Sequence, residues 1–448
     1  MYCNNRRLFI LIVPLRCKSA DLSILFLASL LVVSIINSSD VLAQPVVNRD
    51  SSLKVETVLS GLNFPTTMAF LGPDDILVLE KDEGTVQRIV NGSKLEEPIL
   101  DVNVANERER GMLGIAVANN SNNNGNNSSS TNNNDTPYVF LYYTEANGED
   151  GGEPIGNRLY RYELIDNKLV NPKLLLDLPY LPGPAHNGGV IAIGPDNNVY
   201  VIVGNLYSPV FNKGGENNLV QNIREGKEPD GRGGILRVTQ DGQPVGRNGI
   251  LGDEHPLDMY YAYGIRNSFG ITFDPITGNL WDTENGGRDE INLVEPGFNS
   301  GWDKISGMSF PDSDFDEKDL VDFAGNGKYS DPELDLGSHI APTAITFLHS
   351  DRLGKRYENQ MFVGTTGGTI FNFQLNEDRT GLVLTGPLED KISEDTDDLE
   401  DVTFAEVFET ITDLEVGPDG YLYGILYAKN GTIFRIVPIT TILQSNIS

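Results

Sequence analysis

The segment Gly183-Pro-Ala-His-Asn-Gly-Gly189 places a histidine among glycines. Of the 4 histidines in the chain, His186 is the strongest candidate for chemistry, because neighbouring glycines let a substrate approach the backbone. Histidine is the usual general base, since its ordinary pKa lies near neutrality. We therefore expect His186 to remove a proton from a substrate. The alternative is a histidine that only holds its loop through a hydrogen bond.

A second candidate is the segment Tyr261-Ala-Tyr-Gly-Ile-Arg-Asn267, where Arg266 lies between an aromatic turn and a strand. A guanidinium in this place stabilises developing negative charge or binds a carboxylate. The alternative is a structural arginine that donates hydrogen bonds to backbone carbonyls.

The segment Thr283-Glu-Asn-Gly-Gly-Arg-Asp-Glu-Ile-Asn292 combines two adjacent glycines with three carboxylates. Gly286 and Gly287 leave their backbone carbonyls accessible, and carboxylates add further oxygen atoms. Ligand sets made only of oxygen suit calcium. The segment therefore predicts a calcium site with Gly286, Gly287 and Glu290 as ligands. An acidic hairpin without a metal is the alternative.

Short strands must position these segments, because no stretch of the chain shows sustained helical periodicity. Gly-Pro-Asp turns precede aliphatic or tyrosine-rich runs at 72–74, 194–196 and 417–419, and the run Val199-Tyr-Val-Ile-Val203 is an example. Proline fixes φ in such a turn, and Asp or Gly completes it. A repeated hairpin cannot bury its own face and must stack on its neighbours. The pattern predicts an all-β protein, a β-propeller, with a set of β-sandwich domains as the alternative.

The first 43 residues predict export from the cytoplasm. Basic residues precede an apolar run at 22–36, and Val41-Leu-Ala43 offers a cleavage site before Gln44. The run is shorter than the roughly 20 residues that a bilayer span needs. We expect a signal peptide, with an uncleaved N-terminal membrane anchor as the alternative. Either one places the rest of the chain outside the cytoplasm, because the basic flank stays inside.

The remaining chain is expected to hold a linker at 44–54 and one β-propeller domain at 55–440. Residues 119–134 are rich in Asn and Ser and predict a disordered loop between two strands. The 2 cysteines, Cys3 and Cys17, both precede this domain. The domain therefore lacks disulfides, thiolate nucleophiles and cysteine metal sites.

The charge of the chain excludes some partners. Its formal net charge is −31, so the surface repels phosphate backbones and anionic membranes. We expect no nucleic-acid partner, and membrane contact only through a retained N-terminal anchor.

The three segments occur in this order, with Gly111-Met-Leu-Gly114 before them and Pro296-Gly-Phe-Asn-Ser-Gly-Trp302 after them. In this combination the chain resembles the soluble glucose/sorbosone dehydrogenases that depend on pyrroloquinoline quinone (PQQ), from about Leu59 to Val437. The resemblance implies a six-bladed β-propeller with PQQ and calcium at one mouth of its central channel. It also implies that the carbonyls of Gly286-Gly287 hold the calcium.

The resemblance further implies roles for single residues. His186 matches the base that removes the sugar hydroxyl proton as hydride passes to the quinone. Arg266 and Asn267 match residues that contact the quinone oxygens. Glu109 falls where another polar contact to the cofactor is expected.

Several positions depart from the family pattern. The aspartate that orients the histidine is replaced by Asn205, whose amide holds the ring but stabilises an imidazolium less. Thr410-Ile-Thr412 stands where an Arg-X-Arg pair should bind the carboxylates of the cofactor, and a late lysine is replaced near Thr365-Thr366. Arg288 and Lys391 are the candidates to compensate for these missing cations.

The sequence therefore predicts an extracytoplasmic oxidoreductase that uses PQQ and calcium to oxidise an aldose or a related sugar alcohol. Its electron acceptor is not identified by the sequence. Thr410, Thr412 and Asn205 favour an alternative, a non-catalytic propeller that binds carbohydrate or protein at the cell surface. A propeller enzyme of other chemistry, such as a calcium-dependent lactone hydrolase, is a third possibility.

Overall fold

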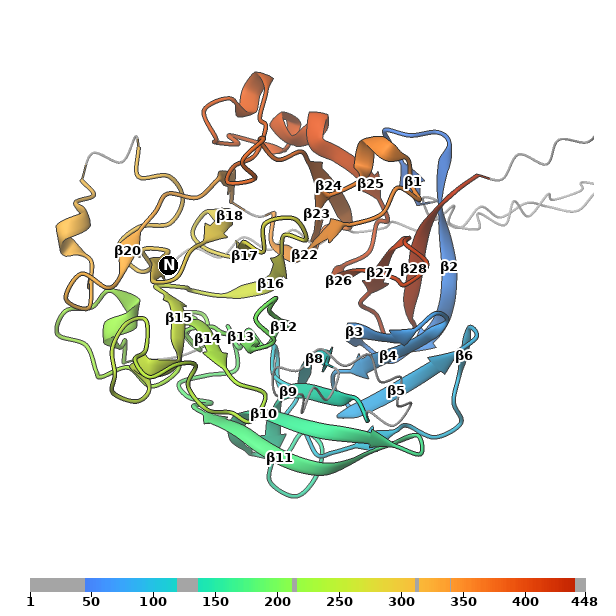
Figure 1. Ribbon diagram of the computed structural model, residues 1–448, viewed down its shortest axis with the longest axis horizontal. Coiled ribbons are helices and arrows are strands. Elements are labelled where there is room, and N and C mark those ends of the chain that lie inside the picture. Colours follow the sequence, from blue (N-terminus) through green and yellow to red (C-terminus); the bar gives the residue numbers. More distant parts are fainter. Residues whose placement is uncertain (1–44, 119–135, 212–215, 311–313, 339, 440–448) are drawn as a thin grey trace, which may run out of the picture. The chain divides into compact units, whose positions relative to one another are not determined.

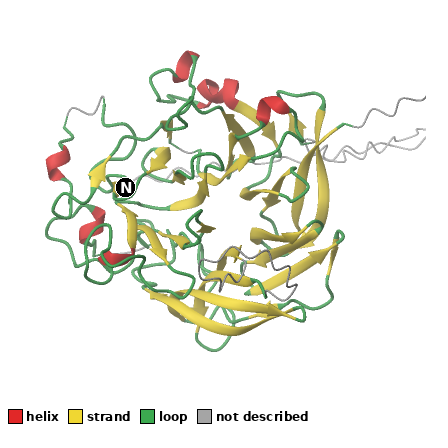
Figure 2. Cartoon of the chain, viewed as in Figure 1, coloured by secondary structure: helices red, strands yellow, loops and turns green. Residues whose placement is uncertain are grey.

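Short strands joined by turns and loops make up nearly all of the described chain (Figures 1 and 2). In this computed structural model the described residues are 45–118, 136–211, 216–310, 314–338 and 340–439. They belong to the unit that runs from Ala43 to Ser448. The predicted export signal at 1–43 and the predicted loop at 119–134 lie outside the described residues.

The first two sheets each consist of consecutive antiparallel strands. One contains β3 (Pro65–Gly72), β4 (Asp75–Glu80), β5 (Thr85–Val90), β6 (Ser93–Lys94) and β7 (Leu100–Asp101). The next contains β8 (Met112–Ala118), β9 (Tyr138–Ala146), β10 (Pro154–Ile165) and β11 (Lys168–Leu178).

The third and fourth sheets exchange chain segments. The third contains β12 (Ile191–Ile193), β13 (Val199–Val203), β14 (Gly234–Val238), β15 (Tyr260–Tyr263), β19 (Phe298–Asn299) and β20 (Lys328–Tyr329). The fourth contains β16 (Ser268–Phe273), β17 (Leu280–Glu284), β18 (Asp289–Val294) and β21 (Leu334–Gly337). After β18 the chain returns to the third sheet, where β19 pairs in parallel with β15.

The last two sheets are completed by the first strands of the chain. One contains β22 (Pro342–Leu348), β23 (Gln360–Thr365), β24 (Thr369–Phe373), β25 (Thr403–Glu406) and β1 (Val46–Val47). The other contains β26 (Ile411–Val416), β27 (Leu422–Leu426), β28 (Gly431–Pro438) and β2 (Leu53–Leu62). The stretch predicted as a linker at 44–54 therefore includes β1 and the start of β2. A two-residue strand carries no periodic signal, so the sequence did not show it.

Inner strands close the sheets into a ring (Figure 1). The first strand of each sheet contacts the first strand of the next, in the order β3, β8, β12, β16, β22 and β26, and β26 contacts β3 again. The described residues thus contain six sheets around a central channel. This arrangement is the predicted all-β propeller, and it contradicts the alternative of separate sandwich domains.

Each pair of neighbouring sheets encloses its own apolar cluster. In β13, Val199, Val201 and Val203 face the sheet of β8–β11, whereas Tyr200 and Ile202 face the sheet of β16–β18. Successive side chains of a strand point to opposite faces, so a strand between two sheets buries both. This explains why β13 is apolar throughout.

Helical structure in the described residues is limited to short 3₁₀ segments. They are η1 (Leu219–Gln221), η2 (Leu257–Met259), η3 (Glu317–Asp319), η4 (Lys355–Tyr357), η5 (Gly386–Leu388) and η6 (Thr396–Val402). Among the described residues, no helix has the length and the apolar character that a bilayer span requires.

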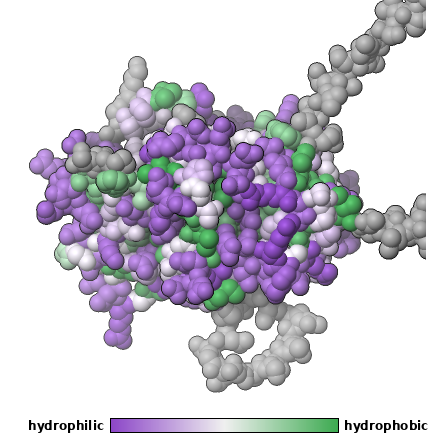
Figure 3. Space-filling view, turned by 90° about the horizontal axis from the view of Figure 1, so that it is seen from above, coloured by the Kyte–Doolittle hydropathy of each residue, from purple (hydrophilic) through white to green (hydrophobic). Residues whose placement is uncertain are grey.

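The molecular surface in Figure 3 is mostly hydrophilic, and its hydrophobic residues are scattered. Single exposed apolar residues are normal on soluble domains. The acidic composition of the chain, with 64 Asp and Glu against 33 Lys and Arg, gives this face its solvated character.

Candidate functional site

His186 lies in the loop between β11 and β12, with a φ of 58°. Its backbone N–H donates to Oε2 of Glu109 at 2.6 Å, and its ring Nδ1 lies 2.7 Å from Oδ1 of Asn205. Glu109 precedes β8 and Asn205 follows β13, so two neighbouring sheets hold the loop. The histidine is only 6% exposed. The predicted pairing of His186 with Asn205 is therefore present.

The contacts of Asn205 indicate which ring nitrogen of His186 carries the proton. Its Oδ1 also accepts the backbone N–H of Tyr207 at 3.0 Å, so it is an acceptor and Nδ1 of His186 carries the proton. Nε2 is then the acceptor that a base requires. Burial lowers the pKa of His186 to about 4, with a further contribution from the nearby charge of Arg266. The imidazole is thus neutral near pH 7.

Arg266 follows β15 and is fixed at both its backbone and its side chain. Its N–H donates to Oε2 of Glu284 at 3.2 Å, and its carbonyl accepts the N–H of Asn205 at 2.9 Å. Its Nη1 donates to the carbonyl of Asn285 at 2.7 Å, and its Cζ lies 5.4 Å from the ring of Trp302. The guanidinium is therefore held between the histidine loop and the β17–β18 hairpin.

Asn267 has an unsatisfied buried oxygen. Its Nδ2 lies 3.5 Å from Oε2 of Glu109, but its Oδ1 has no hydrogen-bond partner among the described residues. An unpaired buried polar group is costly, so this atom marks a place where a ligand can donate a hydrogen bond. Burial also raises the pKa of Glu109.

The glycines of the predicted calcium segment form the turn between β17 and β18. A Cβ on Gly286 would lie 2.3 Å from the carbonyl oxygen of Arg288, so the turn requires glycine there. The N–H of Gly286 donates to Oδ1 of Asp289 at 3.2 Å. Asp289 thus caps the turn, and the backbone conformation of the turn depends on glycine at position 286.

Glu290, the third predicted calcium ligand, has other partners within the sheet. Its carboxylate accepts the N–H of Gly307 and, at 3.3 Å, the hydroxyl of Ser300. It lies directly opposite Glu284 in the pairing of β17 with β18, and burial raises its pKa to about 7. No group of three or more His, Cys, Asp or Glu among the described residues is arranged to hold a metal ion. Calcium binding at this turn stays a prediction.

A cavity of about 260 Å³ lies beside this site and includes Glu109 in its wall. Six threonines contribute to the lining, namely Thr66, Thr67, Thr343, Thr366, Thr410 and Thr412. Five of the hydroxyls donate to backbone carbonyls, including Thr410 to Thr366 at 2.9 Å and Thr412 to Pro65 at 3.2 Å. Because these donors are already used, the threonines offer a ligand few free hydrogen bonds.

Two cations that the sequence did not single out line the same cavity, Lys81 and Arg108. Nζ of Lys81 pairs with Asp82 at 2.5 Å. Arg108 forms no ion pair or hydrogen bond with any described residue, and its Cζ lies 4.3 Å from the ring centre of Phe211. Arg108 directly precedes Glu109 in the sequence, and this was the one feature of the sequence that could have identified it as a cavity residue.

The cations expected to compensate are used elsewhere. Arg288 pairs with Asp335 at 2.5 Å, and Lys391 pairs with Glu333 at 2.9 Å. Neither lines the threonine-rich cavity. Each of the two cations is bound to a carboxylate outside this cavity, and a compensating role for Arg288 or Lys391 stays a prediction.

Known proteins share this architecture and sequence pattern. The sequence model of the Glucose / Sorbosone dehydrogenase family matches residues 62–435. Aldose sugar dehydrogenase YliI of Escherichia coli (strain K12) is 23% identical over 400 residues, which cover 87% of this chain and 94% of that protein. Quinoprotein glucose dehydrogenase B of Acinetobacter calcoaceticus is 27% identical over 277 residues, which cover 56% of this chain and 52% of that protein.

A solved structure has the same fold. The PQQ-bound form of aldose sugar dehydrogenase from Streptomyces coelicolor superposes with a TM-score of 0.58, at 22% identity, and the match covers 86% of this chain and 99% of that one. At this identity the likeness establishes the fold alone. Because the family match extends over most of the propeller, the chain belongs to the glucose/sorbosone dehydrogenase family.

Proposed function

We propose that this protein is an extracytoplasmic, PQQ-dependent dehydrogenase that oxidises an aldose or a related sugar alcohol. The observation that carries the proposal is the neutral His186, held by Asn205 beside Arg266. We further propose that the six sheets are the six blades of the propeller, and that the segment 1–43 exports the chain.

The residues of the site fit an anionic quinone. PQQ is planar, carries three carboxylates and, when bound, accepts the hydride of the sugar. Arg266 and the amide of Asn267 would contact its quinone oxygens, and Gly286 and Gly287 would hold calcium beside it. Arg108, the unpaired cation of the cavity, would bind a carboxylate in place of the missing arginines.

The role of His186 follows from its hydrogen bonds. Asn205 fixes the ring with Nδ1 protonated, so Nε2 is free to accept the proton of a sugar hydroxyl. Glu109 anchors the backbone of the same loop, which keeps the ring in place. Arg266 stabilises negative charge that develops next to the base.

A second candidate function is a propeller that binds a neutral carbohydrate without catalysis. Thr410 and Thr412 favour it, because they line the cavity without supplying a charge that could pair with a carboxylate of PQQ. Such a protein would bind sugar without PQQ, which the following experiment detects.

Calorimetric titration of the purified protein with PQQ, with and without calcium, tests the proposal. We expect calcium-dependent binding at micromolar affinity. Arg108→Gln should weaken this binding about tenfold, the effect of losing one charge-assisted hydrogen bond. Arg352→Gln removes an exposed arginine of the loop between β22 and η4, which does not line the cavity, and serves as the control. No binding at millimolar PQQ, together with binding of sugar alone, would replace the dehydrogenase by the second candidate.

A further inference from the structure

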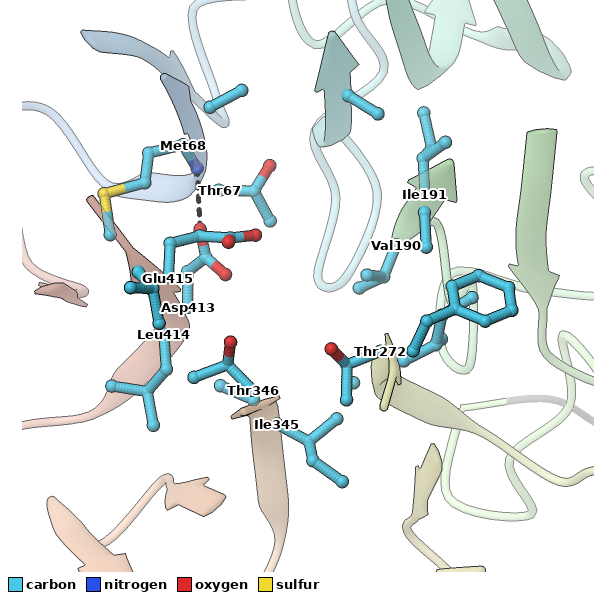
Figure 4. Close-up of a pocket in the computed structure, with 18 of the residues that line it drawn as sticks. Thr67, Met68, Val190, Ile191, Thr272, Ile345, Thr346, Asp413, Leu414 and Glu415 are labelled. Carbon is cyan, nitrogen blue, oxygen red and sulfur yellow. Dashed lines mark hydrogen bonds between the residues drawn. The ribbon is translucent and has the colours of Figure 1, made fainter. Parts of the chain in front are cut away.

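The central channel contains a second cavity, of about 400 Å³, with two carboxylates in its wall. Asp413 and Glu415 come from β26, two residues apart, and so lie on the same face of this strand. Figure 4 shows them side by side in the cavity. Leu414 between them points the other way, into the apolar cluster shared with the sheet of β22–β25.

No cation neutralises this pair. Asp413 accepts the backbone N–H of Met68 at 2.7 Å. Neither carboxylate forms an ion pair with a Lys, Arg or His of the described chain, and no such residue is among the causes that shift their pKa values. Burial raises the pKa of Asp413 to about 7 and, together with the charge of Asp413, raises the pKa of Glu415. Two adjacent, half-buried carboxylates therefore repel each other unless they hold a proton or a cation, and a bound cation would displace the proton.

A separate observation points to a ligand in the same place. Thr346 of β22 is only 6% exposed, and its hydroxyl forms no hydrogen bond with any described residue. In Figure 4 this hydroxyl is turned toward the space beside the two carboxylates. The cavity thus combines two carboxylates that no described cation pairs with and a threonine that is buried as a residue and whose hydroxyl has no hydrogen-bond partner among the described residues. These are oxygen ligands only, from two adjacent strands of the ring.

We propose that this cavity binds a divalent cation of the calcium and magnesium class, with Asp413, Glu415 and Thr346 as ligands. Hard divalent cations prefer oxygen ligands and retain water where a cavity has room for it. The cation site is separate from the Gly286-Gly287 turn, which belongs to β17 and β18. It needs neither PQQ nor sugar, so it does not depend on the proposed dehydrogenase activity.

The position of the site gives the ion a structural role. β26 is the strand that closes the ring, because it contacts β3 of the first sheet. Asp413 already connects the two strands through Met68. An ion bound by Asp413, Glu415 and Thr346 also joins β26 to β22. It removes the repulsion between the two carboxylates on the strand that closes the ring.

Thermal unfolding of the PQQ-free protein tests the proposal. After treatment with EDTA, the wild type should gain about 2–4 °C in Tm when millimolar calcium is added, and calorimetry should show the ion binding. Glu415→Gln should lose this gain, yet should be at least as stable as the wild type in EDTA, because the repulsion is gone. Glu409→Gln, an exposed change of the same charge just before β26, should behave as the wild type.

Other outcomes have definite meanings. The wild type and Glu415→Gln both keep the Gly286-Gly287 turn. Any rise in Tm caused by calcium at that turn is therefore the same in both proteins and cancels in their difference. Absence of binding of calcium and magnesium at 10 mM, or a full gain in Tm in Glu415→Gln, would overturn the proposal. If Glu415→Gln does not fold, Thr346→Val decides: weaker ion binding supports the site, and unchanged binding rejects it.

Discussion

At the scale of single residues, the chemistry of this site depends on what each polar group already binds. Asn205 holds the ring of His186 in its neutral form, with Nε2 as the acceptor. An aspartate at position 205 would place a negative charge beside the ring. Arg108 is unpaired in a cavity whose threonines have used their hydroxyls. The candidate site therefore combines a neutral histidine with a cavity that offers few charged groups to a ligand.

Asn205→Asp should raise the pKa of His186 from its present value of about 4, because a carboxylate stabilises the imidazolium. The base works only when neutral, so activity is lost as pH falls through this pKa. A higher pKa moves that loss to higher pH, by about one to two units. The pH profile of kcat/KM, or an NMR titration of the imidazole, measures the shift. The exposed substitution Asn430→Asp is the control, and an unchanged profile for Asn205→Asp would refute the role of this pair.

At the scale of elements, the turn between β17 and β18 has a conformation that only glycine permits. A side chain at 286 would collide with the carbonyl of Arg288, so the turn would have to open. Such a change moves both the carbonyls of the glycines and Asn285, whose carbonyl binds Arg266. The turn and the guanidinium thus form one rigid unit.

Gly286→Ala should lower the free energy of unfolding by about 1–3 kcal/mol and weaken calcium-dependent PQQ binding. Denaturant unfolding and calorimetry measure the two effects. Gly72→Ala is the matched control, since no atom lies within 4 Å of the added Cβ there. Full stability and unchanged binding in Gly286→Ala would show that the turn is not constrained as described.

At the scale of the whole molecule, the ring is closed by strands from both ends of the described chain. β2 pairs with β28 over most of its length, from Leu53 opposite Pro438 to Leu62 opposite Gly431. β1 pairs with β25 in the neighbouring sheet. Because these pairings join distant parts of the sequence, they hold the last two sheets in the ring.

A chain that begins at Pro65 should fail to fold, because it exposes the edges of β28 and β25 and part of two apolar clusters. A chain that begins at Gln44 keeps both strands and should fold. Circular dichroism and size-exclusion chromatography compare the two. A soluble monomer from the shorter chain would show that closure does not need β1 and β2.

The sequence by itself predicted many of the strands and the residues of the candidate site. Turns of Gly-Pro-Asp type and apolar runs identify β4, β13 and β27, because propensity and turn chemistry act over a few neighbouring residues. His186, Arg266 and Asn267 stand out for the same reason, since each lies in a short glycine- or aromatic-rich segment.

Only the tertiary structure decided which groups these residues contact. The pairing of β1 and β2 with the last sheets, the cations Lys81 and Arg108 at the cavity, and the carboxylate partners of Arg288 and Lys391 all join segments far apart in the chain. Asp413 and Glu415 read as ordinary polar residues of a strand, yet β26 turns them into the channel. The physical reason is that the environment of a side chain depends on packing between sheets, which local sequence does not encode.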